Sequence, residues 1–258
     1  YTAHGPATAI RHLPTAMALR ANPQSAATST GRCAICGEPL VGSYFTLVDR
    51  PERYCACCIA TRPRCATCGA PLGDHHWRLH DGRLQCATCH STAVYDPNLA
   101  RAIFDETVAG VAQQLGMTLN VGVAFRLVDA PTLAALRAEG STAVPEGEHT
   151  LGLYQRRGHI RAIYMLYGLP RLTFRTTVAH EYAHAWQGER CPLLRDDELR
   201  EGHAEWVAYQ HLRWLGCTRA AERMLAAQHP YRPALERLLA LERQLGVHGV
   251  TAYLTRAE

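Results

Sequence analysis

Residues 177–189 read TVAHEYAHAWQGE, and they decide how the second half of this chain folds. A helix is predicted to run through this stretch to about Gly188. At about 3.6 residues per turn, His180 and His184 project from the same helical face and can share one zinc ion. Glu181 lies about 100° round the helix from His180, within reach of a water activated by that metal. The stretch therefore predicts a catalytic base beside a metal site.

Such a site needs a third protein ligand and an open position for water, and the next predicted helix offers candidates. Glu198, Glu201 and Glu205 are spaced by three and four residues, so their carboxylates line one face of a helix that ends near Gly216. A solvated acidic face is the alternative interpretation, but apolar side chains on the same helix indicate that it also packs against a core. Gly202 removes a side chain where two helices can approach closely.

The remaining pattern of residues 91–258 predicts a small sheet followed by helices, which is an α+β order. The expected elements are a helix from Pro97 to before Gly116, a strand at 120–129, a helix at 131–140, two strands within 149–168 joined by a turn at Arg157–Gly158, and helices at 218–228 and 232–245. In HExxH proteases the strand before the active helix, here 159–168, offers its edge to an extended substrate.

The cysteines predict a separate zinc module over residues 32–90. Nine of the 11 cysteines lie in this region, and eight of them form CxxC pairs, a spacing typical of tetrahedral zinc sites rather than disulfides. Neighbouring pairs give two knuckle-and-hairpin units, each with one structural zinc, held by Cys33, Cys36, Cys55 and Cys58 and by Cys65, Cys68, Cys86 and Cys89. Cys57 stays an alternative to Cys55 or Cys58.

The composition limits the binding partners and the cellular compartment that we expect for this protein. Zinc thiolates favour a reducing environment, so a cytoplasmic location is expected. Two zinc ions and eight thiolates bring the formal charge of +4 close to neutral, and the basic residues are scattered, so no nucleic-acid partner is expected. No run of 18 apolar residues predicts a membrane span. Residues 1–31, rich in Ala, Thr and Pro, are predicted to be a flexible tail.

The motifs YMLYGLPRLTFRTTVAHEYAHAWQ and EGHAEWVAYQHLRWL, behind a cysteine module, resemble the LIM-domain peptidases of the DA-one type over about residues 32–215. The resemblance implies a LIM-like double zinc module followed by a zincin-type peptidase domain with an HExxH...E site. It also implies that Glu201, in a Glu-Gly pair after HExxH, is the third ligand, with Glu198 as the runner-up. Glu205 then orients a zinc-bound histidine.

The chain departs from that family in three respects. No ubiquitin-interacting helices precede the module, as in a bacterial-like homologue, so regulation by ubiquitin is not implied. Cys55 stands where LIM domains usually have a histidine. The linker of six residues between Cys58 and Cys65 is longer than is typical of LIM domains, so the two knuckles can be oriented differently.

We therefore expect a zinc-dependent metallopeptidase with one catalytic and two structural zinc ions, in which Glu181 is the catalytic base. Its partners would be a protein or peptide substrate and a protein bound by the LIM-like module, which recruits substrate or regulates the enzyme. The candidate donors to the oxyanion are Tyr164, Tyr167, His203 and Tyr209. The alternative is a catalytically inactive LIM-type interaction scaffold.

Overall fold

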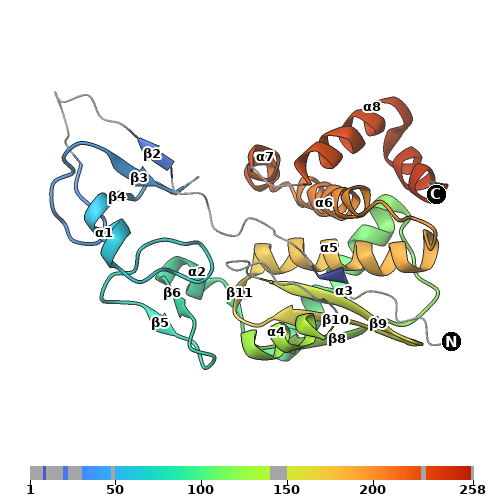
Figure 1. The fold of residues 1–258 in the computed structure, drawn as a ribbon, viewed down its shortest axis with the longest axis horizontal. Coiled ribbons are helices and arrows are strands. Elements are labelled where there is room, and N and C mark those ends of the chain that lie inside the picture. The colour runs from blue at the N-terminus through green and yellow to red at the C-terminus, as the bar shows by residue number, and fades with distance from the viewer. Residues whose placement is uncertain are drawn as a thin grey trace. The chain divides into compact units, whose positions relative to one another are not determined.

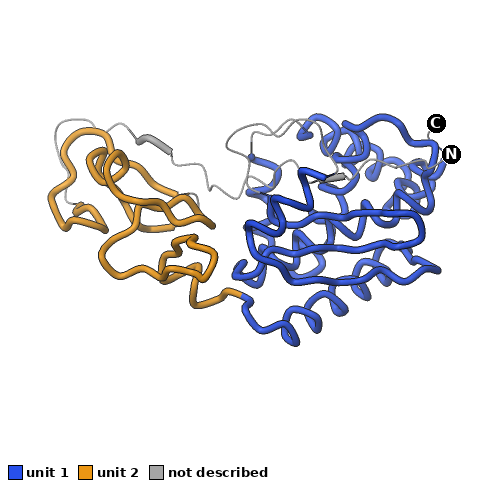
Figure 2. The backbone as a smooth tube through the Cα atoms, turned by 60° about the horizontal axis from the view of Figure 1, so that its bottom comes forward, with its two compact units in different colours: residues 1–13, 94–258 blue, residues 14–93 orange. Residues whose placement is uncertain are grey.

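The computed structural model describes residues 31–47, 50–139, 150–227 and 231–256, together with the backbone of two short strands, β1 (Thr8–Ala9) and β2 (Arg20–Asn22). The chain divides into two compact units (Figure 2): unit 1 comprises residues 1–13 and 94–258, and unit 2 comprises residues 14–93. Apart from these strands and residue 31, the predicted tail at 1–31 lies outside the described residues. No described helix is long and apolar enough to cross a membrane.

Unit 2 contains one local arrangement twice. In each half, the first CxxC pair forms a turn that ends at a glycine with positive φ, a conformation that side chains disfavour. These glycines are Gly37 (74°) and Gly69 (71°). A strand pair follows each turn, and the next cysteine precedes a short helix. The elements are β3 (Tyr44–Thr46), β4 (Arg53–Cys55) and α1 (Ala56–Thr61) in the first half, and β5 (Trp77–Arg78), β6 (Leu84–Gln85) and α2 (Ala87–Ser91) in the second. β2 pairs with β3. Each half of unit 2 thus contains a CxxC turn followed by a strand pair, in the predicted order.

The apolar core of unit 2 is small. It consists of two clusters built on a few large side chains, such as Leu40, Leu47 and Leu72, and cysteines make up part of each cluster. A unit of this size has too little apolar surface to bury for stability by that means alone. Metal binding to the cysteines is therefore expected to supply much of its folding free energy.

The main sheet of unit 1 has the strand order β1-β9-β10-β8. β9 (Gly152–Arg157) and β10 (Ile160–Leu166) form an antiparallel hairpin, with Gly158 in its turn at φ 58°. β8 (Ala124–Val128) is parallel to β10. Because β10 is paired on both sides, the prediction that residues 159–168 offer a free edge is wrong. β9 is the outer strand of the hairpin, and β1 pairs with it.

The helices follow the predicted order. α3 has the expected caps: Asp96 accepts from the Asn98 N–H, and Gly116 ends the helix in the left-handed conformation. Gly246, at φ 72°, interrupts the last helix where the sequence predicts its end, but a second helical segment continues to Leu254. The helices are α3 (Pro97–Leu115), α4 (Ala130–Ala138), α5 (Arg171–Arg190), α6 (Asp197–Trp214), α7 (Thr218–Ala226) and α8 (Arg232–Leu254), with short strands β7 (Ala93–Val94) and β11 (Leu169–Pro170).

Unit 1 is built in layers above its sheet (Figure 1). α5 packs against β9 and β10, α6 packs against α5, and α8 packs against α6. As a result, every side chain of α5 from Thr176 to Gln187 is buried. The protein is therefore a mixed α and β structure with small sheets, and polar groups on the middle of α5 lie deep within unit 1.

Gly202 permits the close approach of α6 and α8. A Cβ added at this position would lie 2.3 Å from the Cβ of Ala234 and 3.1 Å from its carbonyl carbon. Gly202→Ala is therefore expected to lower the free energy of unfolding by about 1–3 kcal/mol through overpacking. Urea unfolding measures this change. Gly122→Ala is the control, since a Cβ there meets nothing within 4 Å, and a fall of the same size in both variants would contradict the packing argument.

Candidate metal centre

His180 and His184 lie one turn apart on α5 and direct the same ring nitrogen toward a common point. Their Nε2 atoms are 3.1 Å apart, and both side chains are buried. The geometry predicted from the HExxH spacing is present. Two buried lone pairs directed at one another are unfavourable unless a proton or a cation lies between them.

Glu201 on α6 completes a group of three ligand atoms. Its Oε2 lies 3.5 Å from the Nε2 of His180 and 3.6 Å from that of His184. This oxygen is buried and has no hydrogen-bond partner among the described residues. Glu198, the runner-up, lies elsewhere: it is half exposed, and its carboxylate is 3.2 Å from Arg237 on α8.

The three atoms fit a tetrahedral zinc ion. Bonds of about 2.0–2.1 Å at tetrahedral angles separate ligand atoms by about 3.3 Å. The separations of 3.1, 3.5 and 3.6 Å lie close to that value. Imidazole nitrogen and carboxylate oxygen are ordinary zinc ligands, and the side chains of His180, His184 and Glu201 therefore suit a metal with one coordination position left open.

The charge around the group also favours a cation. Burial alone lowers the pKa of His180, but the Glu201 and Glu205 carboxylates outweigh it and raise that pKa to about 10. For Glu201, burial raises the pKa, but His184 and His180 outweigh it and bring that pKa below its ordinary value. The carboxylates thus stabilise positive charge at this position, whether a proton or a metal ion carries it.

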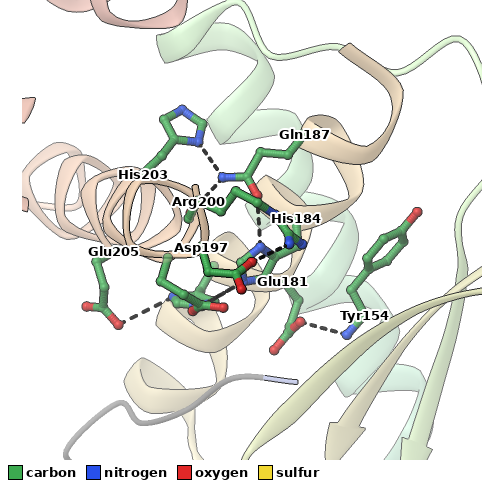
Figure 3. A network of polar contacts seen from close by, with 10 residues as sticks. Tyr154, Glu181, His184, Gln187, Asp197, Arg200, His203 and Glu205 are labelled. Carbon is green, nitrogen blue, oxygen red and sulfur yellow. Dashed lines mark hydrogen bonds and ion pairs between the residues drawn. The ribbon is translucent and has the colours of Figure 1, made fainter. Parts of the chain in front are cut away.

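Glu181 is fully buried and lies between α5 and β9 (Figure 3). Its Oε2 accepts the backbone N–H of Tyr154 at 2.7 Å, while its Oε1 has no hydrogen-bond partner in the described part of the chain. Burial raises the pKa of Glu181 to about 8, although the positive charge of His180 partly offsets the effect. One carboxylate oxygen is thus anchored to β9 and the other is available.

Gly152 on β9 makes room for this arrangement. A Cβ there would lie 2.7 Å from Cγ2 of Thr177 and 3.0 Å from Cγ of Glu181. The strand can therefore pack directly on the face of α5 that carries Glu181. Glycine in a strand often marks such a close approach, but the sequence alone does not say to which helix.

Two polar contacts hold the histidine rings. Nδ1 of His180 lies 3.4 Å from Oε1 of Glu205, which is the place predicted for that carboxylate. Nδ1 of His184 bonds to Oε1 of Gln187 at 2.9 Å. In each ring the Nδ1 contact leaves Nε2 directed toward the candidate metal position.

Gln187 was not identified by sequence reasoning. Its amide nitrogen donates to the Arg200 carbonyl at 2.8 Å and to Nδ1 of His203 at 2.9 Å, so both ends of the amide are used (Figure 3). The available signal was its position three residues after His184, which places both on one helical face. A glutamine at that spacing is common on helices, and nothing in the sequence distinguishes it from a surface residue.

Gln187→Leu is expected to weaken zinc binding at this site about 10- to 100-fold, because the His184 ring loses its orienting partner. Competition with a chromophoric zinc chelator measures the affinity. Gln210→Leu is the matched control, since Gln210 is also buried but bonds to Glu242. Equal affinities in the two variants would contradict the orienting role of Gln187.

The four predicted oxyanion donors are spread over unit 1. His203 is fully buried beside the rings of Trp186 and Trp206, with its Nδ1 bonded to Gln187. Burial lowers the pKa of His203 to about 3, so its ring is neutral. Tyr164 and Tyr209 are partly buried against the main core, and Tyr167 packs against another tyrosine ring. The oxyanion role of these four residues stays a prediction.

In unit 2 the structure brings together the two predicted cysteine groups, Cys33, Cys36, Cys55 and Cys58, and Cys65, Cys68, Cys86 and Cys89. Within them, the Sγ atoms of Cys36 and Cys55 are 3.8 Å apart, as are those of Cys68 and Cys86. Tetrahedral Zn–S bonds of about 2.3 Å separate sulfurs by about 3.8 Å, so both groups fit zinc. Cys57 is exposed and lies outside the first group.

Arg50 supports the second cysteine group. Its guanidinium donates to the sulfurs of Cys86 and Cys89, at 3.6 and 3.5 Å. Four thiolates around one divalent ion leave a net negative charge, and a guanidinium at hydrogen-bond distance compensates part of it. Arg50 lies before β4, in the half of unit 2 that carries the first group.

One comparison with known proteins finds a match. Residues 135–234 match the family model DA1-like, which is described as Protein DA1. The matched segment contains all of α5 and α6 and therefore every residue of the histidine and glutamate group. No curated protein matches the chain, and no solved structure matches it.

Proposed function

We propose that this chain, whose residues 135–234 match the DA1-like family model, is a zinc-dependent metallopeptidase with a zincin-type site. The observation that carries the proposal is the convergence of His180, His184 and Glu201 beside a carboxylate with one free oxygen. A structural zinc site uses four protein ligands, whereas three ligands and an adjacent base are what hydrolysis requires. The proposed substrates are peptide bonds in proteins.

Zinc, when bound, supplies a Lewis acid that activates water and polarises the scissile carbonyl. Glu181 takes the proton from that water with its free Oε1 and later gives it to the leaving amine. The Tyr154 N–H holds the other oxygen and so fixes the direction of the carboxylate. Burial raises the pKa of Glu181 to about 8, so the carboxyl group holds a proton more readily than an exposed one does, as a group that accepts and returns a proton requires.

Side chains that contact the histidine ligands hold the site rigid. Glu205 and Gln187 hold the two imidazole rings through Nδ1, and such partners commonly set the tautomer and the orientation of a metal-binding histidine. Both residues are buried and lie on helices rather than on loops. Such contacts restrict the directions in which the two imidazole rings can present Nε2 to a metal ion.

We further propose that the cysteine groups of unit 2 each hold a structural zinc, giving three zinc ions per chain. The LIM-like module would recruit a substrate or a partner protein, or regulate the enzyme. Zinc thiolates persist in a reducing compartment, which supports a cytoplasmic location.

The test measures zinc content and proteolysis on the same sample. Elemental analysis of protein purified without chelator is expected to give three zinc ions per chain, and fluorescently labelled casein is expected to be cleaved. His184→Ala should reduce the zinc count to two and abolish cleavage. Three zinc ions in wild type without cleavage of casein or of an unstructured peptide library would count against the peptidase and in favour of a binding scaffold.

A further inference from the structure

The outer edge of β9 runs beside Glu181. The Leu166 N–H donates to the Leu151 carbonyl, so this residue pair is hydrogen-bonded across the hairpin. Hydrogen-bonding direction alternates along an antiparallel strand, so Tyr154, three residues later, directs its N–H away from β10. Glu181 accepts that N–H. The Glu181 carboxylate therefore lies at the edge of β9 that faces away from the hairpin.

This edge lies directly against α5, the helix that carries Glu181. A Cβ placed on Gly152 would lie only 2.7 Å from Thr177 and 3.0 Å from Glu181, so the Gly152 backbone is in van der Waals contact with both side chains. A polypeptide that adds to the outer edge of β9 must therefore pass next to Glu181.

The chain itself supplies such a polypeptide. β1 pairs with β9 in antiparallel orientation, with Thr8 opposite Tyr154 and Ala9 opposite Leu153 (β1 is the dark-blue arrow in Figure 1). The residue opposite Thr8 is the one whose N–H binds Glu181. The strand position beside the base is thus held by the N-terminal segment of the same unit.

We propose that Thr8–Ala9 is a tethered competitor of the substrate, which occupies the substrate's strand position on β9. This inference rests on the proposed peptidase function. An extended substrate binds by adding a strand to an exposed sheet edge, and here it must first displace β1. The N-terminal segment therefore reduces substrate binding without altering the chemical step.

The expected size of the effect is modest. A two-residue ladder makes at most a few hydrogen bonds, so as a free peptide it would bind weakly, with a dissociation constant of about 1 mM. Attachment to the same chain gives an effective concentration of about 1–10 mM, which is one to ten times that dissociation constant. The segment is therefore bound for an appreciable fraction of the time, and it raises the KM about 2- to 10-fold.

The first test compares two double variants of the full chain. Thr8→Pro with Ala9→Pro removes the Thr8 N–H, which lies opposite Tyr154 in the ladder, and disfavours a strand at both positions, so it is expected to lower the KM for a peptide substrate about 2- to 10-fold with kcat unchanged. Thr8→Val with Ala9→Val is the matched control, because β-branched residues favour a strand, and its KM should equal or exceed that of wild type. Equal KM values in the two variants would overturn the proposal.

The second test does not depend on cleavage. A tripeptide hydroxamate needs both the zinc ion and the β9 edge, whereas acetohydroxamate needs only the zinc ion. The proline variant should bind the tripeptide hydroxamate about 2- to 10-fold more tightly than the valine variant, with acetohydroxamate unchanged. Equal affinities for the tripeptide, or the same gain for acetohydroxamate, would overturn the inference. If wild type cleaves nothing, the proposed function fails, but this comparison still decides whether β1 competes at the edge.

Discussion

Glu181→Gln is expected to lower the rate of peptide hydrolysis by about 100- to 10,000-fold while all three zinc ions stay bound. The amide keeps the shape of the side chain, and its oxygen can still accept the Tyr154 N–H. It cannot take a proton from water at neutral pH. The loss should therefore appear in kcat, with the KM little changed, in steady-state kinetics on a fluorogenic peptide.

Glu189→Gln is the control for this experiment. Glu189 lies on the same helix, but its carboxylate pairs with Arg161 on β10 rather than with the metal group. Its substitution should leave the hydrolysis rate close to that of wild type. If Glu181→Gln keeps the full rate with three zinc ions bound, Glu181 is not the base and the proposed mechanism is wrong.

Cys89→Ser is expected to remove one zinc ion and to unfold the second half of unit 2. Binding of a structural zinc contributes about 10–16 kcal/mol in small zinc-dependent folds, far more than the few apolar contacts around Leu72 can replace. Elemental analysis should give two zinc ions per chain. Hydrogen exchange should show loss of protection across α2 and the β5–β6 hairpin, while α5 and α6 stay protected.

Cys57→Ser provides the matched control, since Cys57 is exposed and lies outside the cysteine groups. It should retain three zinc ions and full protection. Retention of three zinc ions by Cys89→Ser would show that Cys89 is not a ligand, and loss of zinc from Cys57→Ser would return Cys57 to the set of candidate ligands.

Local signals in the sequence predicted the helices and the ligand spacing. The caps of α3 at Asp96 and Gly116 depend on side chains and conformations close by in sequence, and the turn of α5 that carries His180 and His184 depends only on helical geometry. Glu201 was selected among three acids by a resemblance, and the distances to both histidines agree with that choice.

Long-range packing was the part that the sequence did not predict. The pairing of β1 with β9 joins segments far apart in the chain, and a two-residue strand has no pattern to detect. β10 is interior in the sheet because it pairs with β9 on one side and with β8, a strand from an earlier part of the chain, on the other. The role of Gln187 likewise depends on α6, because its partners Arg200 and His203 come from the next helix.

Arg50 has a consequence for how unit 2 acquires its metal ions. The residue belongs to the half that carries the first cysteine group, yet its guanidinium neutralises sulfurs of the second group. A metal ion bound at the first group would stabilise β3 and β4, the strands on either side of Arg50, and so would position that guanidinium for the second group. If each cysteine group holds a zinc ion, occupation of one group is therefore expected to raise the zinc affinity of the other, so that the two ions load cooperatively rather than as independent events.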